Sequence, residues 1–427
     1  MQTLLSGGRA WVVTGALALF MMINFFDKIV LGLVAVPMMD ELKLTPEQYG
    51  LMAGSFYWLF AIGGIAGGFL ANRFSAKWLL FVMALLWSAC LLPVFYSSLV
   101  VTIILCRVLL GLTEGPAWPV AVHALYKWFP DERRNLPVAI LGQGSALGLM
   151  VAGLALPPIT LHWGWRANFV VLAAIGLIWA ALWAVLAKEG PLGPDSREGM
   201  PAASRVSYRA LLLDRSVLGC FVTHFFGYWS LALGLTWLPA YFQRGLGYDG
   251  VVSGRIYSLV VLFTIPLSIA MAGYSQFMLK RGASSKVARG RYLSCSLLIG
   301  GALFALVLVT GLPDWGKIGI LALGVGLTPV VYSLGSAILA EVVPLSRRGA
   351  VLAINNSVAA MAGVFAPALT GKFVQDMPGA TGYEMGFALC GGLMMLGGIL
   401  GLWLIDPARS QRWLPADEIE MGMPAAR

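Results

Sequence analysis

The sequence has few charged residues and few side chains of the kinds that catalyse reactions. Only 11% of its 427 residues are charged, and it contains 20 acids and three histidines, whereas about a quarter of a typical soluble domain is charged. The histidines lie far apart, and neither a metal-ligand spacing nor a nucleophile turn accompanies them. A soluble domain and a membrane-embedded enzyme are therefore both disfavoured, and we expect no enzyme activity and no resident metal.

Close cysteine pairs and a continuous basic stripe are also missing. The five cysteines, Cys90, Cys106, Cys220, Cys295 and Cys390, all lie inside apolar runs, so we interpret them as small apolar side chains. The net charge is +9, but the basic residues flank the apolar runs. This pattern excludes a nucleic-acid partner and indicates orientation in a membrane.

The chain consists mostly of apolar runs of about 20 residues, enough to cross a hydrocarbon core roughly 30 Å thick. Six runs fall at about 11–36, 50–70, 78–96, 100–126, 136–159 and 167–187, and six more at about 217–241, 253–278, 292–311, 316–340, 349–371 and 383–405. The first run has no small-residue cleavage site, which favours a retained helix. The predicted fold class is an all-α membrane protein with twelve transmembrane helices in two six-helix halves.

The predicted boundaries follow from a polar, turn-rich stretch in the middle of the chain. We expect an N-terminal half at 1–187, a cytoplasmic linker at 188–215, a C-terminal half at 216–405 and a cytoplasmic tail at 406–427. With the N-terminus inside, the inner loops receive Arg73, Lys77, Lys127, Arg133, Arg134, Lys280, Arg281, Lys286, Arg289, Arg291, Arg347 and Arg348. The outer loops keep only Lys43, Arg166, Arg244, Arg255, Lys317 and Lys372. This asymmetry predicts cytoplasmic termini. We expect the protein to be a monomer in the bacterial inner membrane.

Four ionisable residues other than histidine lie well inside the predicted spans. They are Asp27 and Lys28 in the first span and Arg107 and Glu114 in the fourth. An intramembrane charge is costly, so it normally faces a cavity, pairs with an opposite charge and marks a transport pathway. A purely structural ion pair is the alternative. A channel is disfavoured because the polar residues are few and form no ring.

The helix rise of about 1.5 Å per residue gives the depth of each charge. Asp27 is expected roughly 13 Å below the outer end of its helix and Arg107 about 10 Å below, so the two are level. Glu114 lies two turns beyond Arg107, roughly 20 Å deep. A carboxyl near mid-membrane can exchange a proton when its surroundings change.

The remaining base, Lys28, is expected to stay unpaired because Asp27 is matched in depth to Arg107. An ammonium cannot be satisfied by lipid, so Lys28 is available for an anionic substrate. These residues predict a symporter for a small organic anion, with the proton as coupling ion and no cofactor. A metabolite or drug efflux antiporter, which shares such a topology, is the alternative.

Several motifs resemble the anion:cation symporter branch of the major facilitator superfamily, which includes bacterial sugar-acid and aromatic-acid permeases, sialin and the vesicular glutamate transporters. The resemblance covers nearly the whole chain. It rests on Asn24-Phe25-Phe26-Asp27-Lys28, Phe56-Tyr57-Trp58, Gly67-Gly68, Arg107, Gly111, Glu114-Gly115-Pro116, Pro119, Trp163-Gly164-Trp165-Arg166, Thr236-Trp237-Leu238-Pro239-Ala240-Tyr241, Asn356, Pro367 and Gly371. The stretch from Gly68 to Lys77 is similar to the superfamily's loop motif, with Asn72 in the acidic place.

The resemblance implies that Lys28 binds the substrate carboxylate, that Asp27 and Glu114 take up protons and that Arg107 balances the acids. Lysine stands where the branch usually has arginine, so a point charge replaces a planar fork. Tyr57, from the second-helix motif, joins the substrate-binding residues.

The departures from the sugar-acid members concern Phe25, Phe60 and Ser145, which replace two tyrosines and a glutamine. An apolar site disfavours hydroxylated ligands, which predicts an aromatic or short aliphatic carboxylate. A sugar acid (hexonate or hexuronate) or a dicarboxylate is the alternative.

In the second half, the resemblance implies that His224 and Tyr228, spaced i to i+4, line the cavity. A packed histidine is the alternative. Asn355 and Asn356 are candidates because a buried amide needs partners, and Asn356 is the one predicted to bind substrate.

Overall fold

The structure is a computed structural model that describes residues 2–71, 73–130, 133–191, 206–309 and 311–411, and every regular element in these ranges is helical. Eleven helical segments of the described residues are long and apolar enough to cross a membrane, and some of them consist of consecutive shorter elements, such as Pro46–Ala71. The predicted span at 292–311 corresponds to α14 (Tyr292–Leu306), whose 15 residues follow the π-helical segment Lys286–Arg291. The all-helical membrane fold is confirmed, while twelve spans and the side of the termini stay predictions.

Contacts group the described residues into two units. The first contains residues 2–191, Leu233–Leu262 and Pro367–Tyr383. Its helices are α1 (Gln2–Leu33), α2 (Ala35–Leu42), α3 (Pro46–Gly54), the 3-10 turn η1 (Ser55–Tyr57), α4 (Phe60–Ala71), α5 (Ala76–Tyr96), α6 (Val100–Glu114), α7 (Ala117–Tyr126), α8 (Asn135–Trp163), α9 (Ala167–Leu186) and α12 (Leu238–Ala240). Parts of α11 (Arg215–Thr236), α13 (Gly250–Lys280), α18 (Ala362–Asp376) and α19 (Thr381–Leu404) also belong to it. The predicted boundaries near residues 188 and 216 remain untested.

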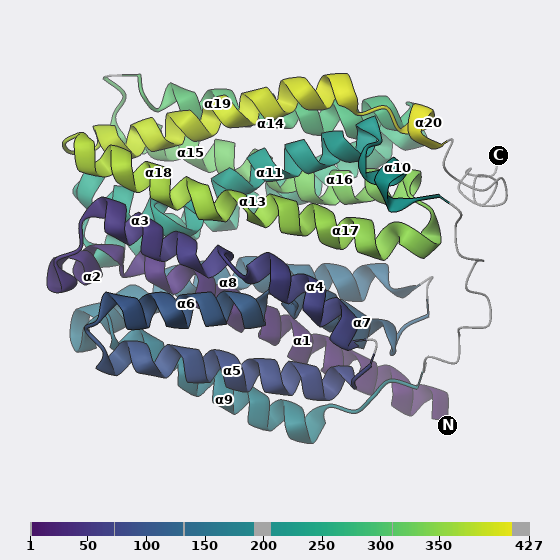
Figure 1. The fold of residues 1–427 in the computed structure, drawn as a ribbon, viewed down its shortest axis with the longest axis horizontal. Coiled ribbons are helices and arrows are strands. Elements are labelled where there is room, and N and C mark those ends of the chain that lie inside the picture. Colours follow the sequence, from purple (N-terminus) through teal and green to yellow (C-terminus); the bar gives the residue numbers. More distant parts are fainter. Residues whose placement is uncertain (1, 72, 131–132, 192–205, 310, 412–427) are drawn as a thin grey trace. The chain divides into compact units, whose positions relative to one another are not determined.

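Small residues let α1 and α8 pack closely within the first unit (Figure 1). A Cβ at Gly144 would lie 2.2 Å from the backbone oxygen of Ala18, and one at Gly148 would lie 2.5 Å from that of Met22. Only a hydrogen in place of the side chain allows this approach. The packing fixes the course of α1 just before its charged turn.

One end of α1 is closed by aromatic side chains from distant parts of the sequence. The Tyr49 hydroxyl lies 3.0 Å from the backbone oxygen of Leu31 and 3.2 Å from that of Thr236. The Trp237 indole donates to the backbone oxygen of Pro367 at 2.9 Å and meets the Tyr49 ring edge-on. Leu31 lies one helical turn beyond Asp27, so these contacts are one turn away from the charged residues of α1.

Two glycines at the same end bring α3 and α18 together. A Cβ at Gly50 would lie 2.4 Å from the backbone oxygen of Pro367, and one at Gly371 would lie 2.5 Å from that of Pro46. Both obstacles are backbone atoms, so a side chain at either glycine would force the two helices apart.

The second unit contains residues 206–232, Phe263–Ala366 and 384–411. Besides its parts of α11, α13, α18 and α19, it holds α10 (Tyr208–Leu212), α14, α15 (Asp314–Leu327), α16 (Pro329–Val342), α17 (Leu345–Ala360) and α20 (Pro407–Ser410). Ion pairs join the ends of its helices: Lys286 to Asp406 at 2.7 Å, Arg289 to Glu341 at 2.6 Å and Lys317 to Glu384 at 2.6 Å. The hydrogen bond from Lys286 lowers the pKa of Asp406 below its ordinary value.

Candidate functional site

A buried chain of polar contacts crosses from α1 to α6. The Lys28 ammonium donates to Asn24 Oδ1 at 2.7 Å, and Asn24 Nδ2 donates to Glu114 Oε2 at 2.9 Å. Lys28 Nζ also lies 3.8 Å from Glu114 Oε2. Asn24 is fully buried, and Lys28 and Glu114 are 9% and 1% exposed. A base, an amide and an acid therefore form one connected and buried group.

Close packing of α6 on η1 and α4 holds Glu114 in this place. A Cβ at Gly111 would lie 1.7 Å from the backbone oxygen of Phe56, and one at Gly115 would lie 2.2 Å from that of Phe60. Glu114 is the last residue of α6 and lies between these two glycines on a tightly packed turn. The sequence motif of glycines around Glu114 thus has a packing function.

Arg107 lies beside Asp27, as the helix rise predicts, but the contact differs from the expected ion pair. Its Nη1 donates to the backbone oxygen of Asp27 at 3.3 Å, and its guanidinium carbon lies 4.7 Å from the centre of the Phe56 ring. Within the described residues, Asp27 Oδ1, Arg107 Nε and Glu114 Oε1 are buried and have no hydrogen-bond partner. A buried polar atom without a hydrogen-bond partner costs free energy, and here three such atoms belong to the charged residues themselves.

The expectation that Lys28 has no partner is wrong. Its ammonium is paired with Glu114 rather than left free. Successive residues of an α-helix point about 100° apart, because 3.6 residues make one turn. The side chains of Asp27 and Lys28 therefore point toward different neighbours. Lys28 lies on the same face of α1 as Asn24, four residues earlier.

Aromatic side chains form the wall around Lys28. Its Nζ lies 4.5 Å from the centre of the Phe25 ring and 5.3 Å from that of Phe60. Phe60 in turn lies 5.4 Å from Phe56 and 6.0 Å from Tyr57, measured between ring centres. The structure thus brings together all the predicted residues of the first unit except Ser145, which lies half-buried on α8 next to Gly144.

His224 and Tyr228 lie together in the second unit, on α11. His224 is 3% exposed, its Nδ1 lies 2.9 Å from the backbone oxygen of Cys220, and its ring covers Gly335 so closely that a Cβ there would be 2.2 Å from Cε1. Tyr332 meets both rings edge-on, at 5.7 Å from His224 and 6.4 Å from Tyr228. His224 is therefore firmly packed in this structure.

The two asparagines of α17 differ in burial. Asn355 is 2% exposed, and its Oδ1 is buried without a hydrogen-bond partner in the described part of the chain, whereas Asn356 is exposed. The argument from a buried amide, which selected Asn356, thus applies to Asn355. The role predicted for Asn356 is untested.

Two further residues were missed by sequence reasoning. The motif that carries the resemblance contains Asn24 without a role of its own, although its spacing of four from Lys28 and its amide in an apolar run point to one. Glu189 belongs to the predicted linker, yet it receives hydrogen bonds from the Ser75 hydroxyl, the backbone nitrogen of Lys77 at 3.2 Å and Lys127 Nζ at 2.7 Å.

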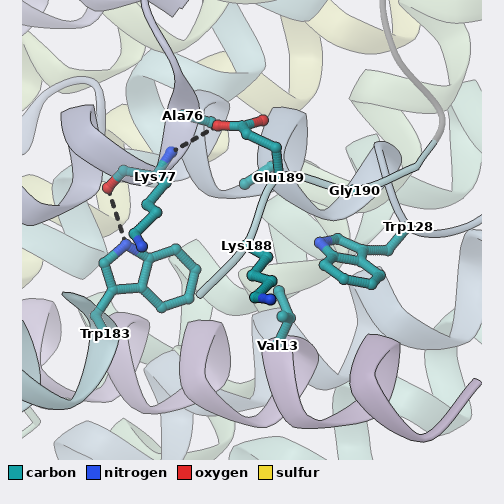
Figure 2. A pocket seen from close by; sticks show the side chains of 9 residues that line it. Val13, Ala76, Lys77, Trp128, Trp183, Lys188, Glu189 and Gly190 are labelled. Carbon is teal, nitrogen blue, oxygen red and sulfur yellow. Dashed lines mark hydrogen bonds between the residues drawn. The ribbon is translucent and has the colours of Figure 1, made fainter. Parts of the chain in front are cut away.

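Glu189 therefore joins the loop after α4 to the ends of α7 and α9. Figure 2 shows Lys77 between Glu189 and Trp183, whose indole donates to the Lys77 backbone oxygen at 2.9 Å. Burial favours the neutral acid, but the hydrogen bonds from Lys127 and Ser75 outweigh it and lower the pKa of the Glu189 carboxyl. Asn72, the residue in the acidic place of the loop motif, lies outside the described residues.

Comparison with known proteins shows the family of the chain. A family model described as the Major Facilitator Superfamily matches residues 17–283 and 282–426. The chain is 29% identical to a hexuronate transporter of Bacillus subtilis (90% of this chain and 92% of that one). It is 27% identical to a probable sulfoacetate transporter of Cupriavidus necator (92% and 93%).

Among solved structures, a bacterial homologue of the human lysosomal transporter Spinster, in an inward-facing and occupied conformation, matches with a TM-score of 0.76 at 15% identity, covering 94% of this chain and 97% of that one. Family and fold are those of transporters and not of enzymes. The organic-anion transporters that the chain resembles are consistent with the anion:cation symporter branch. The chain is a multi-pass membrane protein that belongs to the Major Facilitator Superfamily.

Proposed function

We propose that the protein is a proton-coupled symporter that imports a small organic anion, namely an aromatic or short aliphatic carboxylate, across the bacterial inner membrane. The observation that carries this proposal is the Lys28–Asn24–Glu114 group. It combines a buried cation, which an anion can bind, with a buried acid that can hold a proton.

The proposed roles follow from the contacts. Lys28 binds the substrate carboxylate, and Glu114 takes up the coupling proton because a protonated acid no longer competes for the ammonium. Asp27 is the second proton-binding candidate, since its Oδ1 is buried without a partner in the described ranges. Arg107 supplies the positive charge that lets one of the two acids stay ionised.

The aromatic wall supports the substrate class. A carboxylate on Lys28 would place the rest of a small ligand against Phe25 and Phe60, 4.5 and 5.3 Å from the ammonium. Neither ring offers a hydroxyl to a polyol chain. The other residues proposed to bind substrate are Ser145, Tyr57, His224, Tyr228 and Asn356.

A sugar acid is the second candidate, favoured by the similarity to a hexuronate transporter over 90% of this chain. The two candidates need different binding sites, because a hexuronate requires hydrogen-bond partners for its hydroxyls and an aromatic or short aliphatic carboxylate does not. Competition of benzoate, sulfoacetate and galacturonate for one labelled substrate decides between them. Tight competition by galacturonate alone would reverse the preference and leave the broader anion assignment standing.

Uptake into proteoliposomes tests the function. Labelled benzoate and galacturonate should accumulate only when the outer medium is more acidic than the lumen, and Lys28→Ala should abolish accumulation. Accumulation driven by the opposite gradient would identify an efflux antiporter. Uptake that never exceeds equilibration, whatever the gradient, would contradict proton coupling.

The orientation proposed for this function has both termini and the linker in the cytoplasm. A cysteine placed at Ser196, in a background without the native cysteines, should resist an impermeant thiol reagent in intact cells and react after lysis. Reaction from outside would show that the predicted topology is inverted.

A further inference from the structure

Asn24 lies between the proposed anion-binding base and the proposed proton-binding acid. Its Oδ1 accepts from Lys28 at 2.7 Å, its Nδ2 donates to Glu114 at 2.9 Å, and the side chain is fully buried. The base and the acid act on different ligands. A single residue that contacts both can therefore link the two binding events.

The chemistry of the three groups fixes the direction of the amide. An ammonium only donates hydrogen bonds and an ionised carboxylate only accepts them, so the amide oxygen must face Lys28 and its nitrogen must face Glu114. The structure has this orientation. It is the orientation that an ionised Glu114 requires.

A protonated Glu114 changes that requirement. The acid then has an O–H donor, which the amide oxygen of Asn24 can accept if the amide turns over. The amide nitrogen would then face Lys28, which cannot accept from it. Lys28 would lose its acceptor and, with the amide N–H groups beside it, could donate to an incoming carboxylate.

We propose that Asn24 is a positioning residue whose amide turns over when Glu114 takes up a proton, which releases Lys28 and adds an amide donor to the substrate carboxylate site. The inference rests on the proposed function and specifies how the two ligands are coupled. The proton enters from the outer medium, forms the O–H bond of Glu114 and leaves by breaking that bond on the inner side, while the amide stays neutral.

The surroundings of Glu114 contain other groups that influence its charge. Those within electrostatic range are Asp27 and Lys28 on α1, Arg107 on α6 and the Cys90 thiol on α5. The backbone oxygens of Phe56 and Phe60 pack against Gly111 and Gly115, on the turn that carries Glu114. Only Asn24 makes a hydrogen bond of normal length to both Lys28 and Glu114 within the described residues.

A titration without substrate tests the contact with the acid. The infrared carboxyl band of the purified full-length protein is followed against pH, and Glu114→Gln identifies the band of this residue. Asn24→Leu removes the donor to the ionised acid, so the pH midpoint of the band should rise by about one unit or more. Asn24→Asp also lacks that donor and should raise the midpoint, whereas Thr14→Val, which loses a buried local hydrogen bond on the same helix, should leave it unchanged.

Binding of benzoate and galacturonate at several pH values tests the link to the substrate. Wild-type affinity should rise as the pH falls through the midpoint, by up to about tenfold per unit, and in Asn24→Leu this slope should be at most half as steep. An unchanged midpoint in Asn24→Leu, or a uniform loss of affinity with the wild-type slope, would overturn the role of Asn24. If the wild-type protein bound neither acid, the proposed function would fall, and the substrate-free titration would still decide on Asn24.

Discussion

Replacing Lys28 by methionine should destabilise the protein chiefly through the charge left on Glu114. Methionine retains most of the apolar stem, so the perturbation is the loss of the ammonium. At 3.8 Å, two unit charges in a medium of effective dielectric constant near 20 attract by about 4 kcal/mol. Removing one partner of a buried pair typically costs about 3–5 kcal/mol, and we expect a loss of about 3 kcal/mol because Asn24 still donates to the carboxylate.

A double-mutant cycle isolates this interaction. Lys28→Met, Glu114→Gln and the double variant are unfolded in detergent with SDS, and the fluorescence of the 15 tryptophans reports unfolding. The double variant should be more stable than the sum of the single changes predicts, with a coupling energy of about 2 kcal/mol.

A second ion pair, whose lysine is partly exposed, provides the control. Lys317 and Glu384 are 2.6 Å apart in the other unit, so Lys317→Met should combine additively with Glu114→Gln. Additivity of Lys28→Met with Glu114→Gln to within about 0.5 kcal/mol would refute the assigned pairing and leave Lys28 without a charged partner.

Four other changes have definite expected outcomes. Lys28→Ala should abolish carboxylate binding in a thermal-shift assay and Lys28→Arg should retain part of it; wild-type affinity in the alanine variant would remove Lys28 from the site. Glu114→Gln should still exchange substrate in counterflow but not accumulate it under a pH gradient, and wild-type accumulation would place the coupling proton elsewhere. Gly50→Leu should open the contact between α3 and α18 and speed hydrogen exchange in α3, whereas Gly68→Leu, at an open position, should not. Folding lowers the pKa of Glu189, so its contribution to stability is present above the unfolded-state pKa of about 4.3 and is lost as the pH falls through the folded-state pKa. The difference in melting temperature between wild type and Glu189→Gln should therefore vanish below the folded-state pKa. A constant difference from pH 3 to 7 would contradict the pairing.

The composition of the charged site could be predicted because charge is rare in this chain. Asp27, Lys28, Arg107 and Glu114 stand out in apolar runs where each costs free energy. In the structure Lys28 contacts Glu114, and Arg107 contacts the backbone of Asp27. The helix rise also places Arg107 level with Asp27. Sparse charges thus make a membrane sequence informative about its site.

The pairing could not be predicted because it depends on how far each helix is rotated about its axis. A rotation of about 100° separates Asp27 from Lys28, and no sequence pattern decides which of them faces Glu114. The same limit explains Asn355 and Asn356, where the buried residue is the neighbour of the one selected. The contacts of Glu189 involve residues more than 60 positions away, so no local spacing indicated them.

The observed pairing gives proton coupling a simpler basis than a free lysine would. If Lys28 had no partner, an anion could bind whether or not Glu114 held a proton, and the two events would be independent. With Glu114 already beside the ammonium, the substrate and the ionised acid compete for one positive charge. On the proposed function, a bound carboxylate therefore favours protonation of Glu114, and by thermodynamic reciprocity a proton on Glu114 favours the bound carboxylate by the same factor. The acid that binds the proton is then coupled to the substrate through the base that they share.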